Sequence, residues 1–425
     1  MVKLVRQLWQ SDGASGLSRR DRSSCEYEAY VPDLLGDRSY SLDGDVAADV
    51  ADAEAEVRRL NDSARALADP EALARLLLRA EAVASSRIEG LEVGGRRLLR
   101  AEMANDVGDD ARDVTATEVL GNIEAMRWAM DTRATATKVD VEDVCEIHRR
   151  LLSGTQHEHI AGVIRTEQNW IGGSSYNPCS AAFVPPPADL VRELMTDLCE
   201  FIDNDDLPAV VQAALVHAQF ETIHPFADGN GRTGRALIHV VLRRRGLVDR
   251  AAPPISLILA TDAVQYVAGL TAYRYVGDPD STEAVHGLNR WIATFASATR
   301  RAASEAVTFE QRIVGIQTDW RDALGKVRAN SATDLLLAAL PGAPVVTVAS
   351  AAHLIGRTTQ ATNEAFKALV AAGVLRQVNV GRHRNRAYEA PAVIDEFTAF
   401  ERGLASPTGH EVGAPVRTVP ARPTS

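Results

Sequence analysis

The feature that most constrains this 425-residue chain is a glycine-rich turn that runs directly into a helix, over residues 223–235, IHPFADGNGRTGR. The consecutive dipeptides Asp228-Gly229 and Asn230-Gly231 are turn formers that supply positive φ and leave backbone N–H groups pointing outward. From Leu237 onward, apolar residues recur at helical spacing. A glycine-rich turn at a helix N-terminus combines unpaired N–H donors with the positive end of the helix dipole. The stretch therefore predicts an anion-binding site.

Four side chains of this stretch add chemistry to the anion site. Arg232 and Arg235 are three residues apart, so they lie on one face of the helix and can both reach phosphate oxygens. His224 stands before the turn and offers a base, while Asp228 offers a hard oxygen ligand for a metal ion. The residues alone predict phosphate binding, metal ligation and general-base chemistry within one loop.

Residues 224–235 fill every specified position of the pattern His-Pro-Phe-x-Asp-Gly-Asn-Gly-Arg-x-x-Arg, and in this the chain resembles Fic-domain proteins. The resemblance implies a protein adenylyltransferase that moves AMP from ATP, with Mg²⁺, to a Ser, Thr or Tyr hydroxyl of a protein. It implies that His224 is the catalytic base, that Asp228 holds Mg²⁺ and that Tyr273 lies near the nucleotide base. The nucleotide phosphates are expected against the rest of the loop, which is Gly229, Asn230, Gly231, Arg232, Thr233, Gly234 and Arg235.

A second pattern lies upstream of the loop. A helix is expected to begin with Asp69 as N-cap and Pro70 at its first position, and to end at Gly90. Its last turn, SSRIEG over residues 85–90, resembles the inhibitory motif of Fic proteins, Ser/Thr-x-x-x-Glu-Gly/Asn. The resemblance implies that Glu89 pairs with Arg235, so that ATP binds in an unproductive pose. Glu89 and Ser85 are therefore expected to be regulatory residues of an autoinhibited enzyme.

Residues 170–184 contain two short apolar runs joined by a loop rich in Gly, Ser, Asn and Pro, which predicts a β-hairpin. In Fic proteins a hairpin at this position, the flap, holds an extended segment of the target protein by strand addition, and an exposed strand edge suits that role. A purely structural hairpin is the alternative. His148 and His217 lie on predicted helices among apolar residues, so a packed structural role is expected for both.

From Ser331 the pattern changes to three short helices and a basic hairpin, which resembles a winged helix. The side chains expected on or near its exposed face are Thr359, Gln360, Asn363 and Lys367. The hairpin carries four arginines with no acidic residue between them, a pattern compatible with DNA: Arg376, Arg382, Arg384 and Arg386. The net charge of −11 weakens attraction to phosphate, so dimer or partner contacts are an equal alternative.

Composition bounds the other classes. The net charge of −11 argues against a protein that coats nucleic acid. Four cysteines lie far apart without metal-ligand spacing, which predicts neither a zinc site nor disulfides: Cys25, Cys145, Cys179 and Cys199. The N-terminus is too polar for a secretory signal, and no apolar run approaches the ~18 residues that a membrane span needs. We expect a reduced, cytoplasmic protein with no membrane association.

We predict a mainly α fold, with a Fic-type helical bundle, a β-hairpin flap and a C-terminal winged-helix domain. The predicted order is a flexible arm over residues 1–25, an N-terminal helical region with the inhibitory motif over 26–140, a catalytic core over 141–305, a linker helix over 306–330, the winged helix over 331–400 and a disordered tail over 401–425.

Two other functions fit the same residues. The site could remove AMP from a modified protein, with Glu89 orienting a water molecule. Alternatively, the chain is a DNA-binding transcriptional regulator whose Fic site modifies itself or a partner. The target protein, the modified residue, the nucleotide base and the oligomeric state, including a homodimer, stay open.

Overall fold

The computed structural model describes residues 2–11, 18, 20–64, 69–106, 113–380 and 385–404. Two helices that pack against each other occupy its centre, α7 (Ala209–Ile223) and α8 (Asn230–Arg244). Every residue of α7 is buried, in keeping with a helix that is largely apolar on all faces. Residues 224–229 connect the two helices. The glycine-rich turn is thus held between two buried helices.

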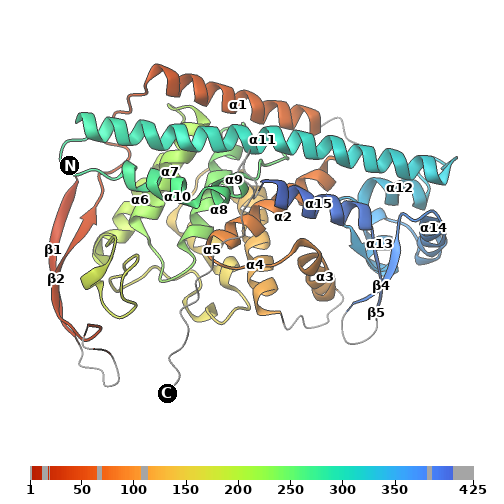
Figure 1. The fold of residues 1–425 in the computed structure, drawn as a ribbon, viewed down its shortest axis with the longest axis horizontal. Helices are drawn as coiled ribbons and strands as arrows, with labels where there is room; N and C mark the ends of the chain where they lie inside the picture. The colour runs from red at the N-terminus through yellow and green to blue at the C-terminus, as the bar shows by residue number, and fades with distance from the viewer. Residues whose placement is uncertain are drawn as a thin grey trace, which may run out of the picture.

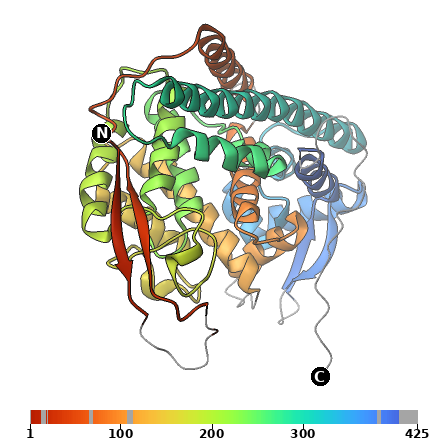
Figure 2. The same cartoon turned by 60° about the vertical axis from the view of Figure 1, so that its left-hand side comes forward.

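Other helices surround this pair (Figures 1 and 2). α2 (Pro70–Ile88) packs on α8 and begins as predicted, since the Asp69 carboxylate accepts the N–H groups of Glu71 and Ala72. Gly90 follows it with φ +82, as expected for a helix end. The remaining helices of the bundle are α3 (Gly95–Asp106), α4 (Val114–Trp128) with a π-helical turn (Ala129–Arg133), α5 (Val141–Leu152), α6 (Val191–Ile202), α9 (Ile255–Thr261) and α10 (Ala263–Tyr273). The predicted mainly α fold is confirmed.

The longest helix described, α11 (Thr282–Leu324), has 43 residues, and α1 (Gly44–Ala64) packs along it. Figure 1 shows both helices running across the top of the molecule. The Ser281 side chain accepts the Ala284 N–H at the start of α11, and Gly325, with φ +69, follows its end. The predicted boundary at residue 305 between the catalytic core and a separate linker helix is wrong, because α11 passes through it without a break.

An N-terminal hairpin stands at one side of the molecule (Figure 2), where β1 (Lys3–Trp9) pairs antiparallel with β2 (Cys25–Val31). The flexible arm predicted for residues 1–25 is therefore wrong for residues 3–9. Along β1 the side chains alternate between exposed and half-buried. A strand that buries only part of one face needs few apolar residues, and this explains why its sequence looked unstructured.

The C-terminal part contains the predicted three helices and hairpin. The helices are α12 (Ala332–Ala339), α13 (Val348–Ile355) and α14 (Thr359–Ala371), and Thr347 and Thr358 cap the last two as expected. A three-stranded sheet has the order β3 (Val345–Val346), β5 (Asn385–Glu389), β4 (Arg376–Val380). α15 (Pro391–Leu404) then packs against α3, α9 and α11. The winged-helix assignment stays a prediction, and Arg382, Arg384 and residues 405–425 lie outside the described residues.

Of the helices in the described part of the chain, none is long and apolar enough to cross a membrane alone. Only α9 and α10 taken together, bent by 101°, meet that criterion of length and composition.

Candidate active site

His224 lies at the C-terminal end of α7 in a left-handed conformation, with φ 51° and ψ 60°. A positive φ is uncommon for a residue other than glycine and persists only where the surroundings enforce it. The His224 N–H donates to the Phe220 carbonyl at 2.9 Å, which closes the helix at this residue. The base expected from the sequence therefore stands at the corner between the two central helices.

Two side chains that precede the flap fix the backbone of this corner. Buried Arg165 donates from Nε to the His224 carbonyl at 2.9 Å, and Asn169 donates to the same carbonyl at 3.1 Å. Asn169 also donates to the Phe226 carbonyl at 3.1 Å. These bonds hold the strained backbone in place. Sequence reasoning missed both residues, because nothing near positions 165–169 marks them as neighbours of residue 224.

The Asn230 side chain closes the loop from the side of α8. Its Oδ1 accepts the Phe226 N–H at 2.9 Å, and its Nδ2 donates to the Phe226 carbonyl at 2.8 Å. The sequence placed Asn230 among the phosphate-binding residues. Because its side-chain atoms already bond to Phe226, only its backbone N–H remains for an anion.

His148 supports the loop from α5, in the structural role that was predicted. Its Nδ1 accepts the Gly162 N–H at 2.9 Å, so Nε2 carries the proton and donates to the Asp228 carbonyl at 2.9 Å. The imidazole also stacks on Phe226, with ring centroids 3.8 Å apart. His217 is likewise fully buried on α7, where Nε2 lies 2.7 Å from the Tyr266 hydroxyl.

The N-terminus of α8 has the features of an anion site. The first N–H bond back to the turn runs from Thr233 to the Gly229 carbonyl, so the N–H groups of residues 230–232 are not used within the helix. Arg232 is 4% exposed, and its Nε and Nη1 have no hydrogen-bond partner among the described residues. Two carboxylate oxygens lie beyond hydrogen-bond distance, Asp228 Oδ2 at 3.7 Å from Nη2 and Glu118 Oε2 at 3.9 Å from Nη1. A buried cation in this state is suited to an anionic ligand.

The second arginine, Arg235, is paired as predicted. It is 1% exposed, and its Nη2 lies 2.7 Å from Glu89 Oε1. Ser85 completes the contact, since its hydroxyl accepts from Arg235 Nε at 2.9 Å and its carbonyl accepts from Nη2 at 2.8 Å. A Cβ added at Gly231 would overlap Glu89 Oε1. The end of α2 therefore places a carboxylate against the N-terminal turn of α8, where an anion is expected.

Asp228 is the remaining loop residue with a predicted ligand. Its carboxylate is 47% exposed and faces Arg232. Across the described residues there is no group of three or more His, Cys, Asp or Glu side chains that could hold a metal ion. Mg²⁺ in nucleotide sites commonly takes one or two carboxylates, substrate phosphates and water, so a single exposed Asp228 fits that use. Thr233 and Gly234 are buried in the first turn and a half of α8, and the Thr233 N–H donates to the Gly229 carbonyl.

Burial dominates the electrostatics of the site. It lowers the pKa of His224 to about 4, with nearby Arg165 acting in the same direction, so the imidazole is neutral at pH 7. Burial raises the pKa of Glu221, one turn earlier on α7, to about 7. The pair shows how the same desolvation favours the neutral form of a base and of an acid.

Tyr273 is not brought to the loop. It is 3% exposed, donates to Gln219 Oε1 at 3.1 Å and lies 3.4 Å from Arg38 Nη1. Arg274, the next residue, instead lies over the Phe183 ring of the flap, 3.5 Å from its centroid. The order of residues 273 and 274 in the chain does not reveal which of the two side chains turns toward the flap.

The predicted hairpin over residues 170–184 is present, with one β-bridge between Ile171 and Phe183. The Ile171 N–H donates to the Phe183 carbonyl at 2.8 Å, and the Ile171 carbonyl accepts the Ala182 N–H at 2.8 Å. The backbone atoms of Ile171 point at Phe183, so those of its neighbours point outward. On the other strand, the Val184 carbonyl accepts the Tyr30 N–H of β2 at 2.9 Å. One edge of the flap is therefore covered by the N-terminal hairpin.

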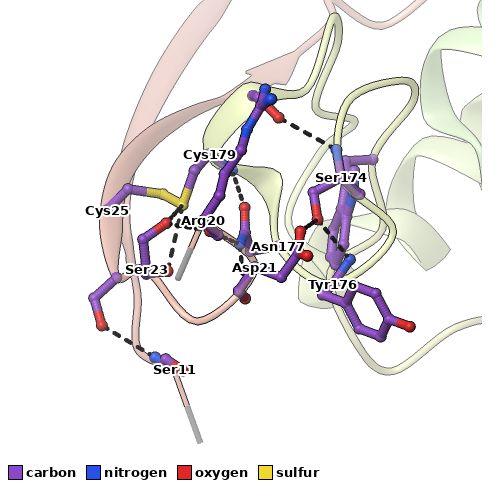
Figure 3. Close-up of a disulfide and its surroundings, with 12 residues drawn as sticks. Ser11, Arg20, Asp21, Ser23, Cys25, Ser174, Tyr176, Asn177 and Cys179 are labelled. Carbon is purple, nitrogen blue, oxygen red and sulfur yellow. Dashed lines mark hydrogen bonds between the residues drawn. A yellow bond between two sulfur atoms is a disulfide. The ribbon is translucent and has the colours of Figure 1, made fainter. Parts of the chain in front are cut away.

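A disulfide between Cys25 and Cys179 also joins β2 to the flap loop (Figure 3). Around it, Ser174 donates to Asp21 at 2.6 Å and Asn177 donates to the Arg20 carbonyl at 3.0 Å. The prediction that no disulfide forms is wrong. The two cysteines are 154 residues apart, and only the folded chain brings them together. Cys145 and Cys199 are buried free thiols.

Two parts of the chain match models of a known protein family. The chain matches the models of the Fic/DOC family over residues 138–242 and of the Fic/DOC family N-terminal region over residues 47–131. Protein adenylyltransferase fic-1 of Caenorhabditis briggsae is 30% identical over 156 residues, which is 36% of this chain and 28% of the relative. Protein adenylyltransferase Fic of Nematostella vectensis is 36% identical over 141 residues, which is 32% of this chain and 30% of the relative. These matches thus span less than a third of the relatives' length.

A solved structure extends the likeness to most of the chain. A Fic family protein from Desulfovibrio desulfuricans aligns with a TM-score of 0.50 and 20% identity, over 83% of this chain and 97% of that one. At this identity the similarity concerns the fold.

Proposed function

We propose that this chain is a protein adenylyltransferase of the Fic/DOC family, which attaches AMP from ATP to a hydroxyl group of a protein, since residues 47–131 and 138–242 match that family's models. The observation that supports this best is the buried Arg232, whose Nε and Nη1 make no hydrogen bond to any described residue and which lies beside a helix N-terminus with unused N–H groups. His224 stands at the other end of the same turn as a neutral imidazole. Anion binding and a base therefore meet within one loop.

In the proposed reaction, His224 accepts the proton of the target hydroxyl. The hydroxyl oxygen bonds to the α-phosphorus, the bond from the α-phosphorus to the bridging oxygen breaks, and pyrophosphate leaves. The N–H groups at the start of α8 and the side chains of Arg232 and Arg235 stabilise the negative charge of the phosphates. Asp228 would hold Mg²⁺, which supplies further positive charge to the phosphates. The loop supplies position and charge rather than covalent chemistry.

We further propose that Glu89 inhibits this activity. Its carboxylate occupies the space in front of Gly231 and bonds to Arg235, so a nucleotide phosphate and Glu89 compete for the same positive charge. The Glu89 side chain is 37% exposed and follows the last turn of α2, which leaves it free to move away. Inhibition of this kind requires no change elsewhere in the fold.

The test is incubation of the full chain with [α-³²P]ATP and Mg²⁺, followed by electrophoresis of the protein and of a lysate containing targets. We expect weak labelling by the wild type, stronger labelling by Glu89→Gly and none by His224→Ala. Equal labelling by the wild type and Glu89→Gly would remove the inhibitory role. Labelling that survives in His224→Ala would remove the assigned base.

Removal of AMP is the competing reaction at this site, because the partly exposed Glu89 carboxylate could orient a water molecule. The labelled protein from the first assay decides between them. If wild-type enzyme releases labelled AMP faster than it adds AMP, and Glu89→Gly does not, removal is the main activity.

For the C-terminal part, we propose a winged helix whose exposed α14 face contacts a partner. Thr359, Gln360, Asn363 and Lys367 are exposed there, as predicted. Lys367 bonds to Glu364 at 2.7 Å and Arg376 to Glu389 at 3.1 Å, so part of the positive charge is neutralised within the chain. This favours a protein partner over DNA. A gel shift with the chain's own upstream DNA that weakens as salt rises would reverse that preference.

A further inference from the structure

The α7 face that packs on α8 carries two buried polar residues, His217 and Glu221, and half-buried His224 caps the helix three residues after Glu221. The reaction described above uses only His224. Glu221 is 8% exposed, and its Oε2 lies 3.9 Å from His224 Nδ1. Neither His224 Nδ1 nor Glu221 Oε1 has a hydrogen-bond partner in the described part of the chain. The Glu221 carboxyl and the His224 Nδ1 atom thus lie close together without a hydrogen bond between them.

Gly234, which has no side chain, leaves space for the Glu221 carboxyl. A Cβ added at Gly234 would lie 3.2 Å from Glu221 Oε1 and 2.8 Å from the Phe220 ring. Any larger residue at position 234 would press on α7 here. A buried carboxyl without a partner is costly, and an apolar side chain of similar size would avoid that cost. The position of Glu221 therefore needs an explanation beyond packing.

The charged and titratable groups around Glu221 come from each neighbouring element. They are Arg235 on α8, Glu89 after α2, Tyr266 on α10 and Arg274 after α10, with His224 on its own helix. Burial outweighs the two arginines and raises the pKa of Glu221 to about 7. The carboxyl is thus able to change charge near neutral pH, while it stands beside the base.

We propose that Glu221 is a positioning residue for His224, an inference that rests on the proposed adenylyl transfer. A small rotation of either side chain closes the 3.9 Å gap, so that His224 Nδ1–H donates to the Glu221 carboxylate. The Nε2 lone pair is then left to take the proton of the target hydroxyl as its oxygen bonds to the α-phosphorus and pyrophosphate departs. The carboxylate also stabilises the imidazolium that forms. This arrangement gives His224 one tautomer and one orientation.

The kinetic test compares the full chain carrying Glu89→Gly with the same chain carrying Glu221→Gln or Glu221→Leu as well. Initial rates of labelling from [α-³²P]ATP are measured between pH 5.5 and 9. In the parent we expect the rate to fall as pH drops through about 7, because Glu221 gains a proton there. The Gln variant should lose that limb of the pH profile and about 10-fold in kcat, and the Leu variant about 100-fold, which is the lower end of what a general base contributes. The KM for ATP should stay within about 2-fold, because Glu221 does not contact the phosphates.

An equal kcat and pH profile in all three proteins would overturn the proposal, as would a lower kcat with an unchanged pH profile, which is the sign of a packing defect. A second measurement does not need activity. In ¹⁵N-histidine spectra at pH 8, with the His224→Ala spectrum identifying the signal, the parent should show the Nδ1–H tautomer and Glu221→Leu a mixture. An Nε2–H tautomer in the parent would also overturn it. If the parent transfers no AMP, the proposed activity fails, and these spectra alone decide the role of Glu221.

Discussion

In the proposed inhibition, the contact between Glu89 and Arg235 weakens ATP binding, and the Glu89→Ala variant measures by how much. Breaking a fully buried ion pair costs about 3–5 kcal/mol, because the remaining charge is left unpaired. Here Arg235 is 1% exposed, but the Glu89 side chain is 37% exposed, and Ser85 still accepts two hydrogen bonds from the guanidinium. The pair is therefore intermediate between buried and surface pairs, and we expect a loss of about 1–2 kcal/mol.

The same free energy opposes ATP in the wild type, since the phosphates must displace Glu89 before they reach Arg235. A difference of about 1–2 kcal/mol corresponds to about 5- to 30-fold in Kd. Glu89→Ala should thus unfold at a lower temperature than the wild type without ligand, and yet bind ATP about 5- to 30-fold more tightly. At a fixed ATP concentration it should gain more thermal stability than the wild type gains.

Isothermal titration calorimetry with ATP and Mg²⁺, paired with thermal unfolding, measures both quantities. Glu92→Ala is the matched control, because Glu92 is an exposed glutamate three residues further along the same segment. The ATP affinity and the unfolding temperature of Glu92→Ala should equal those of the wild type. Equal ATP affinity in Glu89→Ala and the wild type would show that Glu89 and the nucleotide do not compete.

Three further outcomes are expected. The Glu221 carboxyl has a pKa of about 7 in the folded protein, raised from its usual 4.5, so the stability it contributes is present below pH 4.5 and is lost as pH rises to 7. In urea denaturation, the free energy of unfolding of Glu221→Gln relative to the wild type should therefore rise by about 2 kcal/mol between pH 5 and pH 8. An equal difference at both pH values would contradict the burial of the Glu221 carboxyl. Gly173→Ala places a Cβ onto the Ser180 carbonyl at φ +78, and should lower labelling of a protein target while ATP affinity is kept. Non-reducing peptide mapping of the wild type should find the bond between Cys25 and Cys179. Without reductant, Cys25→Ser should then be less stable than the wild type by about 2–4 kcal/mol, and in dithiothreitol the two proteins should be equally stable.

The sequence predicted well those features that depend on residues close together in the chain, such as helix caps and turns. The caps at Asp69, Thr347 and Thr358 lie within three residues of the N–H groups they bind, so their helix starts could be read directly. The same holds for the turn at Gly229, whose positive φ follows from the residue type. The pairing of Glu89 with Arg235 came from the family resemblance, and the structure bears out the contact.

What the sequence did not predict depends on contacts between distant segments. Arg165 acts on a carbonyl 59 residues away, and the disulfide spans 154 residues. A buried arginine that bonds to carbonyls looks, in a sequence, like any surface arginine.

The unbroken course of α11 has a mechanical consequence. A helix of 43 residues is about 65 Å long, and this one packs on α1, α7, α9 and α10 along part of its length and on α12 and α15 along another. Between residues 282 and 324 there is thus no break in the helix at which the central helices could move against α12 and α15. A load applied at α14 is transmitted along a single stiff rod to the helices that frame His224. The two ends of the molecule should melt together in one calorimetric transition, and a protease should find no preferred cut between residues 282 and 324.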